Sequence, residues 1–130
     1  MSVAPFEVQN GVTDDGMKVL SIRGELDLDT APRLEKELDS IDSAETGGLM
    51  IDLSDCDFID STGVALIVRT WKRLDIVAAG GGKGRVALCC PGPQVQRVLE
   101  ITGLESAIPV HSDRESALAE LRAALKPASR

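Results

Sequence analysis

The fold is decided by residues 49–63, which read LMIDLSDCDFIDSTG. The run from Leu49 to Leu53 is short and almost continuously apolar, which is typical of a strand that is buried on both faces of a parallel sheet. From Ser61 to about Ala78, apolar residues recur at helical spacing. This stretch therefore predicts a buried strand, a polar connection and a helix, around which the rest of the chain can be placed.

Upstream, two apolar segments near 6–12 and 17–26 flank Asp14-Asp15-Gly16, a turn signal, so we expect an antiparallel hairpin. The residues at 29–32 combine helix-capping side chains with a proline that a first helical turn tolerates. Apolar residues at helical spacing then predict a helix that extends to about Ile41.

Downstream, the pattern predicts a buried strand at 85–90, a helix at 94–102, a short strand at 108–111 and a helix at 112–126. Ser112 and Glu115 have the spacing of a capping box at the start of the last helix. The order β-β-α-β-α-β-α-β-α predicts an α/β fold with a mixed, mainly parallel sheet, an antiparallel N-terminal hairpin and helices packed against it. We expect one domain over residues 1–130, with an ordered core at roughly 5–126.

The composition excludes several classes of function. The chain has 130 residues, a formal net charge of -7 and only 2% aromatic residues, which opposes direct binding of nucleic acid. No apolar run is long enough to span a bilayer and no secretion leader is evident, so we expect a cytoplasmic protein that does not bind membranes. The single histidine and three cysteines contain no CxxC pair, so no metal and no cofactor is expected.

Functional residues of parallel sheets gather at the carboxyl ends of the strands, where the sequence places residues 55–63. Ser61 stands at the expected start of a helix, where its hydroxyl could cap the free backbone N–H groups. A phosphate on Ser61 would face the positive end of the same helix and add negative charge beside Asp55, Asp57 and Asp60. Capping and phosphorylation do not exclude one another.

The helix that begins at Ser61 is expected to present a docking face. Its residues away from the apolar stripe mix basic and apolar side chains: Ser61, Ala65, Leu66, Arg69, Lys72, Ile76 and Val77.

Four segments, 24–27 (GELD), 31–38, 51–54 (IDLS) and above all 60–64 (DSTGV), resemble the STAS domain family, and within it the bacterial anti-sigma-factor antagonists. The resemblance covers nearly the whole chain in order. It implies a non-enzymatic protein of transcription regulation and stress response that works by partner switching. In that scheme, the unphosphorylated antagonist binds an anti-sigma factor and so frees a sigma factor.

The resemblance also implies the partners and the site. The anti-sigma factor is a serine kinase of the histidine-kinase-type ATPase fold, which inactivates the antagonist by phosphorylating the residue that matches Ser61. A metal-dependent serine phosphatase of the PPM type restores the active form. Thr62 stays open as a second phosphoacceptor, and Ala65 stands where many relatives have Gly. The residues implied in partner binding are Asp27, Asp60, Thr62, Gly63, Val64, Ala65 and Arg69.

Two other functions stay open. A STAS domain can serve as a scaffold subunit in a signalling or lipid-transport complex, where Ser61 need not be phosphorylated. The carboxylates of Asp52, Asp55, Asp57 and Asp60 could hold Mg²⁺ as in an aspartate-phosphorylated receiver domain. However, the acidic pair that ends the first strand of a receiver is missing. The sequence does not indicate which sigma factor, stimulus or oligomeric state applies.

The cysteines provide one redox hypothesis. Cys56 and the pair Cys89-Cys90 would lie near the ends of neighbouring strands, so a bridge from Cys56 to either of them could modulate the Ser61 segment. Against it stand the reducing cytoplasm and the tendency of buried cysteine to act as a small apolar residue.

Overall fold

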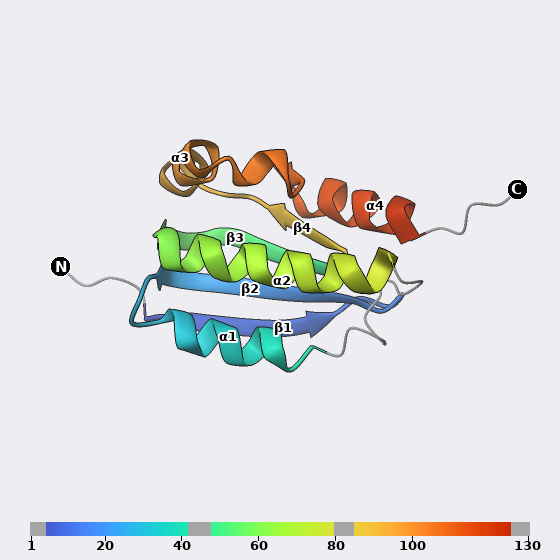
Figure 1. Cartoon of the computed structure of the whole chain (residues 1–130), viewed down its shortest axis with the longest axis horizontal. Coiled ribbons are helices and arrows are strands. Elements are labelled where there is room, and N and C mark those ends of the chain that lie inside the picture. The colour runs from blue at the N-terminus through green and yellow to red at the C-terminus, as the bar shows by residue number, and fades with distance from the viewer. Residues whose placement is uncertain (1–4, 42–47, 80–84, 126–130) are drawn as a thin grey trace, which may run out of the picture.

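The computed structural model describes residues 5–41, 48–79 and 85–125 (Figure 1). The chain forms β1 (Glu7–Val12), β2 (Met17–Leu26), α1 (Ala31–Asp39), β3 (Gly48–Ile59), α2 (Ser61–Ala79), β4 (Val86–Cys89), α3 (Pro93–Thr102), a 3₁₀ turn (Leu104–Ser106), β5 (Val110–His111) and α4 (Arg114–Leu125). This order confirms the predicted α/β fold.

Within the described residues, one five-stranded sheet has the strand order β1-β2-β3-β4-β5. The pair β1 and β2 is antiparallel, and every other neighbouring pair is parallel. The hairpin turns at Gly16, whose φ of 90° lies in the left-handed region that favours glycine. The predicted hairpin and the mainly parallel sheet are therefore both confirmed.

Successive side chains of the central strands point to opposite faces of the sheet, so the apolar core consists of two layers. Leu49, Ile51 and Leu53 of β3 belong to the larger apolar cluster, which also contains buried side chains of α1, α2 and α3. Met50, the residue between the first two, belongs to a smaller cluster with Ala117 and Leu121 of α4. Helices α1 and α2 thus pack in front of the sheet in Figure 1, and α4 packs on the opposite face.

Strand β3 is longer than the apolar run at 49–53 predicts. It continues to Ile59, because residues 55, 56, 58 and 59 pair with Arg23–Leu26 of β2, with one register shift before Asp55 and a second after Cys56. One shift lies next to Gly24, which has a φ of 92° and is buried. Periodicity did not predict this extension, because the side chains of residues 54–58 are mostly exposed and form no apolar run.

Two local predictions were wrong. Leu66, expected on the exposed face of α2, is 6% exposed and packs in the larger cluster. The cap of α4 is Asp113 and not Ser112, because the Asp113 carboxylate accepts hydrogen bonds from the backbone N–H (2.7 Å) and the hydroxyl (3.1 Å) of Ser116. The side chains of Ile76 and Val77, assigned to the same exposed face, lie outside the described part of the molecule.

Among the described residues, no helix combines the length and the apolar character needed to cross a membrane.

Candidate functional site

The ends of β2 and β3 are joined at the carboxyl edge of the sheet. The backbone N–H of Asp60 donates to the carbonyl of Leu26 at 3.2 Å, directly before α2 begins. Residues 27 and 60 are therefore brought to the same edge, although they are far apart in the sequence. The site is built on two rigid strand ends.

Asp60 caps α2. Its carboxylate oxygen Oδ1 accepts hydrogen bonds from the backbone N–H groups of Thr62 (2.9 Å) and Gly63 (3.3 Å), and its carbonyl accepts one from Val64 (3.1 Å). These are the free donors of a first helical turn, and a carboxylate there also benefits from the positive helix end.

Ser61 is consequently released from the capping role that its position allowed. It is the first residue of α2 and is exposed. Within the described part of the chain, its hydroxyl has no hydrogen-bond partner. The helix therefore does not depend on this hydroxyl, which stands in solvent at the start of α2.

Asp27 shapes the turn from β2 into α1. Its Oδ1 accepts hydrogen bonds from the backbone N–H groups of Asp29 (3.0 Å) and Thr30 (3.1 Å). The hydroxyl of Thr30 donates to the carbonyl of Glu25 at 2.7 Å, so it ties the helix start to β2 and does not cap α1. Asp27 thus fixes one wall of the site.

A groove of about 600 Å³ lies beside Ser61 and is lined by residues of α1, α2 and the turn before α1. Its apolar part includes Leu28, of which 71% is exposed to solvent. At the other end, Arg69 of α2 donates to Glu35 of α1 at 2.5 Å. The lining residues are Leu28, Ala31, Pro32, Glu35, Ser61, Thr62, Ala65, Leu66 and Arg69.

The structure divides the residues that the resemblance assigned to partner binding. Thr62, Ala65 and Arg69 line the groove together with Ser61. Gly63 and Val64 are buried, the latter with 8% exposure, and neither lines the groove.

Gly63 has a packing role instead. A Cβ atom at this position would lie 2.7 Å from Cγ of Leu26 and 2.9 Å from Cγ1 of Ile59. The absence of a side chain therefore lets α2 begin close against the ends of β2 and β3.

Sequence reasoning missed the α1 side of the groove. Leu28, Pro32 and Glu35 belong to a turn and a helix start that the sequence marked as a capped helix and a family match, but not as a surface for a partner. The one signal is Leu28 itself, an apolar residue placed between Asp27 and Asp29 in a polar helix-start segment.

The acidic residues do not form the Mg²⁺ group that a receiver domain would need. Asp52 is buried, and its carboxylate bonds with the backbone N–H of Ser54 (2.9 Å) and with Nε of Arg114 (2.6 Å). Burial alone would raise the pKa of Asp52, but the hydrogen bonds from Ser54 and Arg114 outweigh it and lower the pKa. Among the residues described, the group suited to a metal combines Asp52 with Cys89 and Cys90.

The hypothesis of a disulfide from Cys56 to Cys89 or Cys90 does not fit this sheet. All three thiols are free. Cys56 packs in the larger core cluster and Cys89 in the smaller one, on the other face. Cys89 pairs with Asp52, four residues before Cys56, which adds about 13 Å along the strand, beyond the reach of a disulfide. Cys90 packs on the same side as Cys89.

Burial raises the pKa of the Cys56 thiol to about 11. This thiol is therefore protonated at neutral pH, which makes it a poor nucleophile.

The chain is similar to proteins of known family over most of its length. A family profile described as the STAS domain matches residues 9–117. BtrV of Bordetella bronchiseptica, named as a candidate anti-sigma factor antagonist, is 34% identical over 112 residues, which cover 85% of this chain and 91% of that protein. RsfB of Mycobacterium tuberculosis, named as an anti-sigma-F factor antagonist, is 29% identical over 120 residues, which cover 92% of this chain and 93% of RsfB.

The fold agrees with a solved structure as well. The crystal structure of an anti-sigma factor antagonist from Mycobacterium paratuberculosis superposes with a TM-score of 0.79 at 29% sequence identity. The match covers 91% of this chain and 95% of the other.

Proposed function

Because the chain belongs to the STAS domain family, we propose that it is an anti-sigma-factor antagonist that binds an anti-sigma factor through the groove beside Ser61. The names of its relatives support this function, since BtrV, RsfB and the mycobacterial structure are all described as such antagonists. Binding, rather than catalysis, is the output of the domain.

The groove has the composition of a protein-binding surface. Leu28 supplies an exposed apolar contact, and Arg69 supplies a guanidinium that can bond with a partner. Arginine and apolar anchors at the centre of a patch carry much of the affinity of protein interfaces. Because the walls stand on the ends of β2 and β3, little ordering is needed on binding.

Phosphorylation of Ser61 would switch this surface off. The observation that carries the proposal is that Asp60 alone caps α2, so the exposed Ser61 hydroxyl is free for modification. A phosphate adds about −1.5 to −2 charge at neutral pH without removing any bond of the fold. It would lie next to Asp60 at the edge of the groove, where a hydrated dianion opposes the packing of apolar or acidic partner groups.

The modifying partners follow from the same scheme. The anti-sigma factor acts as the serine kinase that phosphorylates Ser61, and a PPM-type phosphatase removes the phosphate. The exposed position of Ser61 at a helix start supports access by both enzymes.

The test is a pull-down from native cell extract with wild-type, Ser61→Ala and Ser61→Asp baits, followed by mass spectrometry. We expect wild type and Ser61→Ala to recover an anti-sigma factor with a kinase fold, and Ser61→Asp to bind it at least about tenfold more weakly. Incubation of that partner with wild type and ATP should then place phosphate on Ser61.

Ser106→Asp provides the matched control, because it adds the same charge at an exposed serine outside the groove. If Ser61→Asp and Ser106→Asp recover the partner equally well, Ser61 is not a switch. Recovery of the same scaffold proteins by all baits, without a kinase-fold protein, would overturn the antagonist function and favour a scaffold subunit.

A further inference from the structure

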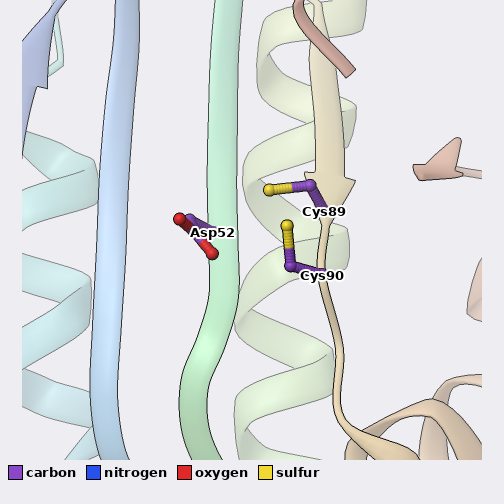
Figure 2. A group of neighbouring side chains, drawn as sticks. All are labelled: Asp52, Cys89 and Cys90. Atoms are coloured by element: carbon purple, nitrogen blue, oxygen red, sulfur yellow. The ribbon is translucent and has the colours of Figure 1, made fainter. Parts of the chain in front are cut away.

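Away from the groove, on the α4 side of the sheet, three ligand-type side chains converge. A carboxylate oxygen of Asp52 and the Sγ atoms of Cys89 and Cys90 all lie within 4.8 Å of one another. Figure 2 shows the three side chains together, with Asp52 on β3 and the two cysteines at the end of β4. The proposed antagonist function makes no use of this group.

The sheet register accounts for the first two members. Asp52 of β3 is paired with Cys89 of the parallel strand β4, and paired residues in neighbouring strands project to the same face. Met50 and Ala87, one pair earlier on that face, both belong to the smaller core cluster. Asp52 therefore reaches Cys89 along a face that is otherwise apolar.

Cys90 joins the group through an uncommon backbone conformation. In an extended strand it would point to the face opposite Cys89, but its φ of 65° lies in the left-handed region that non-glycine residues seldom adopt. The hydrogen bond from its backbone N–H to the carbonyl of His111 (2.8 Å) holds this conformation. The result is two adjacent thiols on one face, at a cost of about 1–2 kcal/mol for a left-handed residue.

We propose that Asp52, Cys89 and Cys90 form a binding site for one Zn²⁺ ion. The separations of up to 4.8 Å are close to those of the donor set, because ligands at about 2.0–2.3 Å from a tetrahedral zinc lie roughly 3.3–3.8 Å apart. Small side-chain movements would therefore bring the three ligand atoms to the distances of a zinc site. Three protein ligands leave the fourth position to water.

The donor chemistry selects the metal. Two thiolates favour Zn²⁺ over Mg²⁺ or Ca²⁺, which prefer oxygen ligands. Zn²⁺ with two thiolates and one carboxylate carries a net charge of −1. The guanidinium of Arg114, which contacts Asp52 at 2.6 Å, balances this charge and orients the carboxylate.

Binding is coupled to proton release. A thiol binds Zn²⁺ as the thiolate, so each Zn–S bond that forms releases one proton to solvent. The affinity for Zn²⁺ should therefore rise with pH.

The metal can reach the site from solvent. The side chain of Arg114 is 51% exposed, and Cys90 lines a surface hollow of about 370 Å³ together with His111 and Ser112. A bound ion would join the middle of β3 to the end of β4 beside the start of α4.

The test uses the whole chain, reduced with a phosphine and stripped of metal with a chelator that is then removed. Co²⁺ serves as the probe, because thiolate coordination gives a charge-transfer band and a tetrahedral site gives intense visible bands. We expect one Co²⁺ per chain with both features, and displacement of the Co²⁺ by Zn²⁺.

Variants decide which residues bind. Cys90→Ala removes a half-buried ligand, and both it and Asp52→Asn should weaken Zn²⁺ binding at least about tenfold. Cys56→Ala is the matched control, because the Cys56 thiol lies on the other face of the sheet. The Zn²⁺ affinity of Cys56→Ala should therefore equal that of wild type. Circular dichroism of each variant verifies that it is folded.

Three outcomes would overturn the proposal. The first is the absence of a charge-transfer band, and the second is unchanged affinity in folded Cys90→Ala. The third is one metal per two chains, which would indicate ligands shared between copies. None of these results bears on the Ser61 switch, so each proposal is tested independently of the other.

Discussion

At the start of α2, neighbouring side chains divide two tasks. The Asp60 carboxylate accepts hydrogen bonds from the backbone N–H groups of Thr62 and Gly63, whereas Ser61 is exposed and lines the groove. This division matters for a switch, because a modified residue that also capped the helix would change the fold each time it was phosphorylated. Here the charge of Ser61 can change while the cap stays in place.

Removal of the Asp60 cap should therefore lower the stability of the fold, whereas removal of the Ser61 hydroxyl should not. We expect Asp60→Ala to lower the free energy of unfolding by about 1 kcal/mol, the usual cost of a lost N-cap. Ser61→Ala should change it by less than about 0.5 kcal/mol, as surface substitutions do. Urea denaturation followed by circular dichroism measures both. A loss in Ser61→Ala as large as that in Asp60→Ala would show that Ser61 carries the cap.

At the scale of elements, two arginines of α4 form ion pairs with residues outside the helix, one with a buried partner and one with an exposed partner. Arg114 at its start contacts Asp52, whose side chain is 6% exposed, and also donates to the hydroxyl of Ser21 at 2.9 Å. Arg122, further along α4, contacts Asp15 in the exposed hairpin turn. Of these two pairs, only the first leaves a buried carboxylate without an opposite charge when its arginine is removed.

The Arg114 contact should make stability depend on pH. Asp52 has a lowered pKa in the folded state, so the pair contributes fully above the ordinary value of 3.8 and its contribution is lost as the pH falls through the lowered folded value. With a chelator present, we expect Arg114→Gln to lower the free energy of unfolding at pH 7 by about 1–3 kcal/mol. The difference from wild type should shrink below pH 3.8, as denaturant titrations across pH would show.

Arg122→Gln is the control for this prediction. Its pair with Asp15 is solvated on both sides, and exposed ion pairs contribute little. The prediction fails if Arg114→Gln and Arg122→Gln reduce stability equally, or if the effect of Arg114→Gln is independent of pH.

At the scale of the whole molecule, the groove exists because α1 and α2 lie side by side over the same face of the sheet (Figure 1). Its polar end is closed by the contact between Arg69 and Glu35, and its apolar end is open at Leu28. Exposed Leu28 contributes little to the core, so its apolar surface is available to the partner.

We expect Leu28→Ala to weaken binding of the anti-sigma factor about tenfold, the effect of losing an apolar anchor worth about 1.4 kcal/mol. Its thermal stability should stay that of wild type. Ile101→Ala is the matched control, because Ile101 is 77% exposed but lies on α3, outside the groove. Titration calorimetry with the purified partner compares the two. Equal affinities for both variants would place the interface elsewhere.

The sequence by itself determined the order of the elements, the antiparallel hairpin and the position of Ser61 at the start of α2. These features depend on periodicity, turn residues and helix-start signals, which act over a few neighbouring residues. The extension of β3 to Ile59 was not evident, because residues 54–58 gain their partners from β2 and show no apolar run of their own.

Only the tertiary structure decided which side chains meet. It assigned the helix cap to Asp60, buried Leu66 and completed the groove with Leu28 and Glu35 from α1. It also separated Cys56 from Cys89 and brought Asp52 beside Cys89 and Cys90, where the cysteine spacing alone predicted no metal. The physical reason is that strand register and one left-handed residue set these contacts, and neither is encoded in local spacing.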